Sequence, residues 1–297
     1  MSQPSEAASG NIYDLGYRRY EGPRLGRRAA VIGLYLQSLR SAFGLGRRAT
    51  SKIIPVALVV LASLPAAIQL GVAAISTGRV DFISAPEYYT YVQVILALFV
   101  AAVGPELVGR DQRSRTLPLY FSRPLTRDDY VIAKLAALTT AMLALTLLPQ
   151  SILFIGNMFA GSDSIGFLQD NWKDIPRILV SALGLSFFVT AIALAVAAQT
   201  PRRSFATGGV IALFLVTGTV SGILVNTATG DGGRWAILVS LYDVMRGATY
   251  WVFSHDASSD DILTTAHLNG LVYVAAMATI TAVATWLVFR RYRGMSL

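Results

Sequence analysis

The sequence predicts an all-α protein that crosses a membrane six times. Of its 297 residues, 54% are hydrophobic and only 14% are charged, whereas a soluble globular chain carries about 25% charged residues. The mean hydropathy is +0.54. The apolar residues gather in six long segments, and the basic residues lie mostly on one side of them. Together these observations indicate a multi-pass membrane protein.

Six segments are long and apolar enough to cross a hydrocarbon core of about 30 Å. None has a charged residue near its middle, where an Arg or Asp costs about 2.5–3.5 kcal/mol on insertion scales. A proton relay built from intramembrane carboxylates is therefore disfavoured. The predicted spans are residues 53–75, 88–107, 130–156, 177–199, 205–226 and 268–289.

The basic residues predict the orientation of the chain. Twenty of the 25 Lys and Arg residues lie in the N-terminal tail, the loops after the second and fourth spans, and the C-terminal tail. Cytoplasmic loops carry such an excess. We therefore expect both termini in the cytoplasm, in the inner (cytoplasmic) membrane of the cell. The same pattern explains the net charge of +8, so we expect membrane lipids as surroundings and no nucleic-acid partner.

The residues for several kinds of chemistry are absent. The sequence has no cysteine, no HExxH motif and only three lysines, at positions 52, 134 and 173. None of these lysines follows a Gly-rich loop of the kind that cradles ATP phosphates. We therefore expect no catalytic residue, no metal site and no cofactor bound by this chain.

Residues 27–48, "RRAAVIGLYLQSLRSAFGLGRR", have the pattern of an amphipathic helix. Four apolar residues, Ile32, Leu36, Leu39 and Phe43, recur at helical spacing. The arginines of the same stretch, Arg40, Arg47 and Arg48, would lie among lipid headgroups. A short additional membrane span is the alternative, and Arg40 near its centre disfavours it. We therefore divide the chain into a cytoplasmic tail (1–26), an interfacial helix (27–50) and a six-span domain (51–297).

The loop before the last span is long and aromatic. It contains "RWAILVSLYDVMRGATYWVF", which Asp243, Arg246 and Gly247 interrupt. We expect short re-entrant helices in the outer leaflet; a loop folded over the external mouth is the alternative. In the fifth span, Gly218 and Gly222 form a small-xxx-small pair that could allow close helix packing or dimerisation.

The loop between the second and third spans, "SRTLPLYFSRPLTRDDYVIAK", is stiff and basic. Pro118 and Pro124 restrict its backbone, and Thr126 with Asp129 has the spacing of a capping box. Lys134 is expected to snorkel to the interface. Four apolar residues, Leu117, Leu119, Tyr120 and Phe121, are expected to be exposed and to dock in a partner's groove. A loop that only fixes topology is the alternative.

From Glu106 to Lys134, this stretch resembles the loop between the second and third spans of ABC-2 type transporter permeases. The matching positions are Glu106, Gly109, Thr116, Leu117, Ser122, Pro124, Thr126, Arg127 and Lys134. The interfacial helix likewise resembles the connecting (elbow) helix of that family. The resemblance extends over most of the chain, but its specific part is this loop.

The resemblance implies a permease that pairs with a second copy and with two copies of a separate ABC ATPase, which would bind ATP and Mg²⁺. The loop, as a coupling helix, would contact the ATPase through Glu106, Gly109, Arg110, Arg113, Arg115, Thr116, Leu117, Leu119, Tyr120, Phe121, Arg123, Pro124 and Arg127. Aromatic residues concentrate near the second span and the external segment, which favours export of a lipid-like or hydrophobic substrate over a polysaccharide.

Two other functions remain open from the residues alone. The first is an ABC module whose ATPase cycle drives signalling or envelope assembly without transport. The second is an intramembrane hydrolase in which Ser186 or Ser221 would act with His267. Serine is common in membrane helices as a packing residue, so the hydrolase is the less favoured reading.

Overall fold

In the computed structural model, every regular element is a helix within the described residues, which are 22, 25–46, 49–75, 83–114, 116–122, 124–160, 163–227, 231–258 and 261–295. The elements are α1 (Gly26–Ala42), α2 (Thr50–Ile75), α3 (Ala85–Arg113), α4 (Leu117–Phe121), α5 (Arg127–Ala160), α6 (Ser164–Asn171), α7 (Asp174–Gln199), α8 (Arg203–Thr227), α9 (Asp231–Trp235), the 3-10 helix η1 (Ala236–Val239), α10 (Leu241–Phe253), α11 (Ile262–Ala266) and α12 (Gly270–Arg293).

Six of these helices, α2, α3, α5, α7, α8 and α12, are long and apolar enough to cross a membrane. They coincide with the six predicted spans, so the all-helical, six-span prediction is confirmed. The helices extend beyond the predicted ranges: α3 continues to Arg113, and α5 begins already at Arg127. Hydropathy marks only the apolar part of a helix, whereas backbone hydrogen bonding continues into the polar ends.

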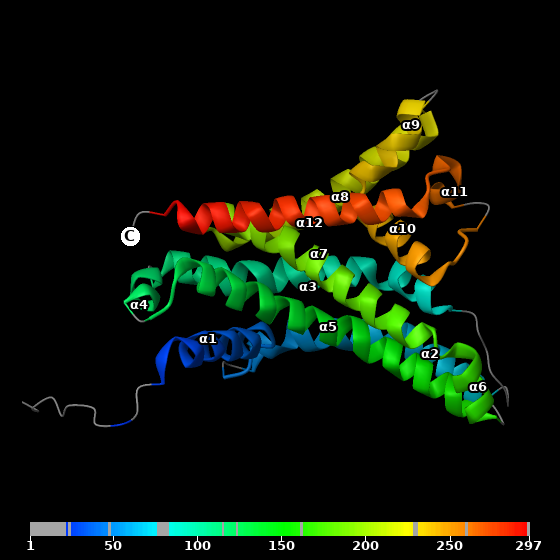
Figure 1. The fold of residues 1–297 in the computed structure, drawn as a ribbon, viewed down its shortest axis with the longest axis horizontal. Coiled ribbons are helices and arrows are strands. Elements are labelled where there is room, and N and C mark those ends of the chain that lie inside the picture. Colours follow the sequence, from blue (N-terminus) through cyan, green and yellow to red (C-terminus); the bar gives the residue numbers. More distant parts are fainter. Residues whose placement is uncertain are drawn as a thin grey trace, which may run out of the picture.

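Figure 1 shows the two ends of the bundle. The C-terminus, α4 and α1 lie toward one end, which we call the α4 end; α6, α9 and α11 lie toward the other, the α6 end. Helices α3 and α7 are the most buried of the spans, whereas α2, α8 and α12 are largely exposed. The exposed apolar surface of these three helices is what a hydrocarbon environment requires.

Helix α1 packs along α5. Leu34, Ser38 and Ala42 form its buried face, and the Tyr35 hydroxyl donates to Thr140 Oγ1 at 3.0 Å. Ile32 and Leu36 are exposed. Leu39 and Phe43, expected on the same lipid-facing side, instead pack against the core, because the protein-facing stripe is rotated toward them.

The segment between α8 and α12 folds back into the bundle. Helix α10 packs against α3, α7, α8 and α12, so the apolar sequence "LYDVMRGATYWVF" lies in protein contacts rather than in an open loop. Gly247 makes this possible, because a Cβ there would overlap the Tyr273 ring of α12.

Candidate functional site

Helix α4 is the short element between α3 and α5 at the α4 end (Figure 1). The Thr116 carbonyl accepts from the amides of Leu119 and Tyr120, at 3.0 and 3.3 Å, which closes its first turn. Pro118 is tolerated because the first turn of a helix needs no amide donor. Pro118 and Pro124 restrict the backbone, and the turn hydrogen bonds close it, so even a five-residue segment forms a defined helix.

Three of the four apolar residues of α4 face the protein, not the outside. Leu117 is buried, and the rings of Tyr120 and Phe121 lie 5.9 and 6.2 Å from the Tyr130 ring. Only Leu119 is strongly exposed, at 68%. The expectation that all four are exposed is therefore wrong, because the aromatic rings pack across the loop onto α5.

A buried ion pair joins α3 to α5 directly behind α4. Lys134 Nζ lies 2.8 Å from Asp111 Oδ2 and donates to the Leu107 carbonyl at 2.9 Å. The Tyr130 hydroxyl donates to the same Asp111 oxygen at 2.8 Å. Lys134 is thus held inside the protein, which corrects the expectation that it snorkels to the interface. Its partner Asp111 lies 23 positions earlier, on another helix, so local spacing does not reveal the pair.

Tyr130 and its neighbours extend this contact to α7 and α12. The Tyr292 ring of α12 lies 5.1 Å from the Tyr130 ring. Gln112 Nε2 donates to the Tyr292 hydroxyl at 2.9 Å and to the Ala198 carbonyl of α7 at 3.4 Å. Four membrane helices, α3, α5, α7 and α12, therefore meet around two tyrosines at the α4 end.

The capping box that the sequence predicts is present at the start of α5. The Thr126 amide donates to Asp129 Oδ2 at 3.0 Å, and the Asp129 amide donates to Thr126 Oγ1 at 3.2 Å. Asp129 also accepts two bonds from Arg27 of α1, each 2.8 Å long. This bidentate contact raises the pKa of Arg27 above its ordinary value. The Thr126 amide and the Arg27 guanidinium thus hold the same carboxylate.

The preceding two residues tie α5 to the end of α12. Asp128 accepts from Arg293 Nε and Nη2, at 2.8 and 2.7 Å, and Arg127 Nη1 donates to the Arg293 carbonyl at 2.6 Å. No local pattern in the sequence marks Arg27, Asp128 or Arg293 as a partner in these contacts. Acidic residues at a helix start were visible in the sequence, but their partners lie 102 and 165 positions away.

The remaining residues of the candidate coupling set lie in different environments. Glu106 pairs with Arg203 at 3.2 Å, and Gly109 is buried with Thr116 half-buried. Arg110, Arg113 and Pro124 are exposed. Arg115 and Arg123 lie outside the described residues, as do Arg47 and Arg48 of the interfacial set, whereas Arg40 is described and exposed.

The glycine pair of α8 separates into two environments. A Cβ at Gly218 would lie 3.5 Å from the Tyr242 ring of α10, whereas a Cβ at Gly222 would have nothing within 4 Å. Gly218 therefore packs within the chain, and Gly222 leaves its side of α8 open.

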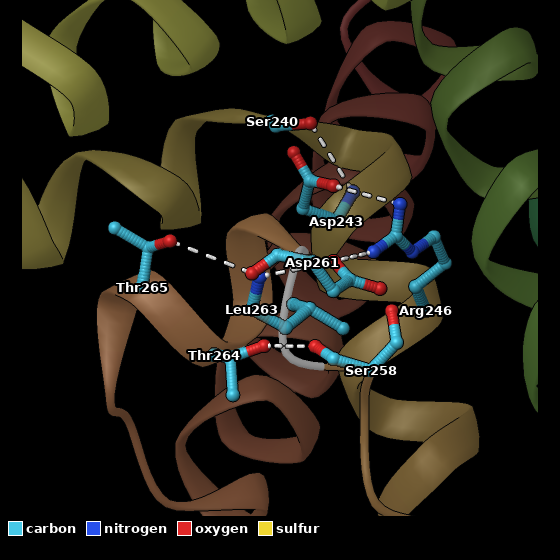
Figure 2. A network of polar contacts seen from close by, with 8 residues as sticks. All are labelled: Ser240, Asp243, Arg246, Ser258, Asp261, Leu263, Thr264 and Thr265. Carbon is cyan, nitrogen blue, oxygen red and sulfur yellow. Dashed lines mark hydrogen bonds and ion pairs between the residues drawn. The ribbon is translucent and has the colours of Figure 1, made fainter.

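A second polar cluster joins α10 to α11 (Figure 2), and α11 lies toward the α6 end (Figure 1). Arg246 contacts Asp243 of its own helix at 3.8 Å and forms a closer ion pair with Asp261. Asp261 also caps α11 by accepting from the Leu263 amide at 3.1 Å. Arg246 thus joins α10 to the start of α11, and the charges that interrupt the apolar segment serve to fasten it.

The serine residues considered for hydrolysis are not arranged for it. Ser186 Oγ lies 3.2 Å from Thr146 Oγ1 in the buried contact between α7 and α5. Ser221 is buried, and His267 is exposed at the end of α11. Among the described residues, no hydrogen bond links either serine to a histidine. The packing role expected of serine in membrane helices accounts for Ser186.

Comparison with known proteins identifies the family of the chain. Residues 24–297 match the family model described as ABC-2 family transporter protein. A search of curated proteins finds no match. Because the family match spans nearly the whole sequence and agrees with six candidate spans, the protein belongs to the ABC-2 family: it is a multi-pass membrane permease and a transport subunit whose 297 residues include no ATPase domain.

Proposed function

We propose that this permease is the membrane part of an ATP-driven exporter and that α4 is the element through which a separate ABC ATPase moves it. Permeases of this family generally pair with ABC ATPases. The observation that carries the proposal is the contrast within α4: Leu119 is 68% exposed, while Leu117 is buried and two aromatic residues are packed inward. One exposed apolar side chain on a firmly held helix fits a hot spot in a partner's pocket.

The contacts behind α4 supply a route for mechanical force. A push on α4 would reach α5 through the aromatic contacts with Tyr130, and α3 through the pair of Asp111 with Lys134. From there it would reach α12 through Tyr292 and Arg293, and α1 through Arg27. Because packed elements move as units, these contacts would convert closure of the ATPase into a tilt of several spans.

The rest of the assembly follows from this proposal. Two identical permeases and two ATPase subunits would form the transporter, with ATP and Mg²⁺ bound by the ATPases. The α4 end would face the cytoplasm, both termini would be cytoplasmic, and α1 would be the interfacial elbow helix. The open side of α8 at Gly222 suits contact with the second permease. Helix α10 would be the re-entrant element, and a hydrophobic or lipid-like molecule the substrate.

The substitution Leu119→Asp tests the coupling role. It places a charge on an exposed residue, so the permease should fold and insert normally. In the complex the charge would be buried, which costs a few kcal/mol, and both co-purification of the ATPase and its permease-stimulated ATP hydrolysis should fall at least tenfold. The matched control is Leu119→Met, which preserves the apolar volume and should retain both.

Unchanged complex formation and hydrolysis in Leu119→Asp would contradict the coupling role of α4. Transport of a fluorescent lipid in proteoliposomes would then separate export from an ABC module that drives signalling or envelope assembly. Coupled hydrolysis without movement of any amphiphile tested would favour the non-transporting module.

A further inference from the structure

An outward-facing groove runs along the contact between α7 and α12 and reaches Arg293 at the end of α12. It has a volume of about 730 Å³. Small residues such as Gly184, Ala278 and Ala282 leave the hollow, and Phe187, Trp286 and Phe289 border it. Trp286 is 55% exposed. An apolar groove of this size on the surface of two membrane helices is suited to a hydrocarbon chain.

The part of the groove nearer the α4 end matches one leaflet of a bilayer in length. The α12 residues that line the groove run from Val274 to Arg293, about 28 Å at 1.5 Å per residue, and the part from Ala282 to Arg293 accounts for about 16 Å of this. Half of a hydrocarbon core of about 30 Å is about 15 Å. An acyl chain lying against this part of α12 would therefore reach from the middle of the membrane to the α4 end.

Two guanidinium groups lie over the aromatic residues where the groove reaches the α4 end. Arg290 is 5.1 Å from the Trp286 ring centroid, and Arg293 is 5.4 Å from that of Phe289. Arg293 is already paired with Asp128. Arg290 makes no ion pair with any residue that the structure describes. Arg290, which lies over the Trp286 ring beside the groove and not in its lining, thus provides an uncompensated positive charge at the level of headgroups.

The charges also argue against a second copy of the chain as the occupant. At the α4 end, the described carboxylates are Glu106, Asp111, Asp128 and Asp129, and each is paired within its own chain. Among the described residues, a second permease would therefore bring mostly further arginines toward Arg290. A phosphate group would supply the negative counter-charge that no described residue provides to Arg290.

We propose that an anionic phospholipid of the cytoplasmic leaflet occupies this groove, with one acyl chain between α7 and α12 and its phosphate on Arg290. Arg293 is neutralised by its pair with Asp128, so Arg290 supplies the positive charge. The lipid is a resident of the outer face of the bundle and is distinct from any transported molecule.

Native mass spectrometry of the purified permease, titrated with phosphatidylglycerol or phosphatidylcholine, tests the proposal. Wild type should bind phosphatidylglycerol the more tightly. Arg290→Gln should weaken phosphatidylglycerol binding about fivefold, the effect of one basic residue at an anionic surface, and leave phosphatidylcholine unchanged. Ala282→Phe, which fills the groove, should weaken both lipids. The control is Arg28→Gln, an exposed arginine of α1, which should change neither.

Equal binding of the two lipids by wild type would overturn the proposal, as would equal effects of Arg290→Gln and Arg28→Gln. Loss of dimer in Ala282→Phe, measured by light scattering without added lipid, would instead assign the groove to a second copy and would also overturn it. Thermal unfolding of each variant verifies that the fold is retained. None of these measurements involves the ATPase, so they are independent of the coupling role of α4.

Discussion

At the residue scale, the contact of Lys134 with Asp111 shows how this protein keeps a charge inside. Both side chains are largely buried, and removing charged groups from water costs several kcal/mol per ion. The cost is offset only because the two groups pair and find further partners, the Tyr130 hydroxyl and the Leu107 carbonyl. The helices on either side of α4, α3 and α5, are thereby fixed relative to one another.

We therefore expect Asp111→Asn to destabilise the protein by about 3–5 kcal/mol, because it leaves the Lys134 ammonium buried without a counter-charge. The measurement is denaturant or thermal unfolding of the purified permease in detergent. Adding Lys134→Met to Asp111→Asn should restore part of the loss. The control is Asp170→Asn at an exposed carboxylate of α6; a single Asp111 variant no less stable than this control would contradict the role of the pair.

At the element scale, the first turn of α5 is the point where α1, α12 and the α4 loop are joined. Asp129 serves at once as capping residue and as partner of Arg27, and Asp128 holds Arg293. Exposed ion pairs contribute little to stability, about 0–1 kcal/mol each. Their value here is positional, because a bidentate bond fixes the direction in which α1 approaches α5.

Arg27→Ala should therefore loosen the start of α1 and leave global unfolding almost unchanged, within about 1 kcal/mol. Amide hydrogen exchange of the peptide around residues 25–34 should become faster, whereas exchange in α5 and α7 should not. Arg28→Ala is the matched control, because Arg28 is the adjacent exposed arginine. If the two variants gave the same exchange rates, the Arg27–Asp129 contact would have no positional role.

At the scale of the whole molecule, the two ends of the bundle are chemically different. The α4 end has paired acids, several exposed arginines and the C-terminus, and the α6 end has short helices fastened by Arg246 (Figures 1 and 2). The excess of Lys and Arg on the first of these sides predicts that it faces the cytoplasm.

Single cysteines test this orientation, since the natural sequence has none. Ser114→Cys and Ser258→Cys are at exposed positions of opposite sides of the predicted topology, and Ser164→Cys lies in α6. In intact cells, a membrane-impermeant maleimide should label residues 258 and 164 and should label residue 114 only after the membrane is opened. Labelling of residue 114 from outside would reverse the proposed topology.

The sequence by itself determined what depends on composition and local spacing. It predicted six apolar spans, a helical chain and the capping box of Thr126 with Asp129, because each follows from solvation or from residues a few positions apart. It also contained the pattern that resembles ABC-2 permeases. The orientation of the chain and the coupling role of the loop stay predictions from the same source.

Only the tertiary structure decided which side chains face inward. Lys134 is buried because Asp111 on another helix meets it, and Tyr120 and Phe121 turn inward because Tyr130 offers a surface. The contacts of Arg27 and Arg293 likewise cross more than 100 positions. A side chain is buried only when another part of the protein packs against it. In a helical bundle, that other part belongs to a helix distant in sequence, so it depends on how the helices pack.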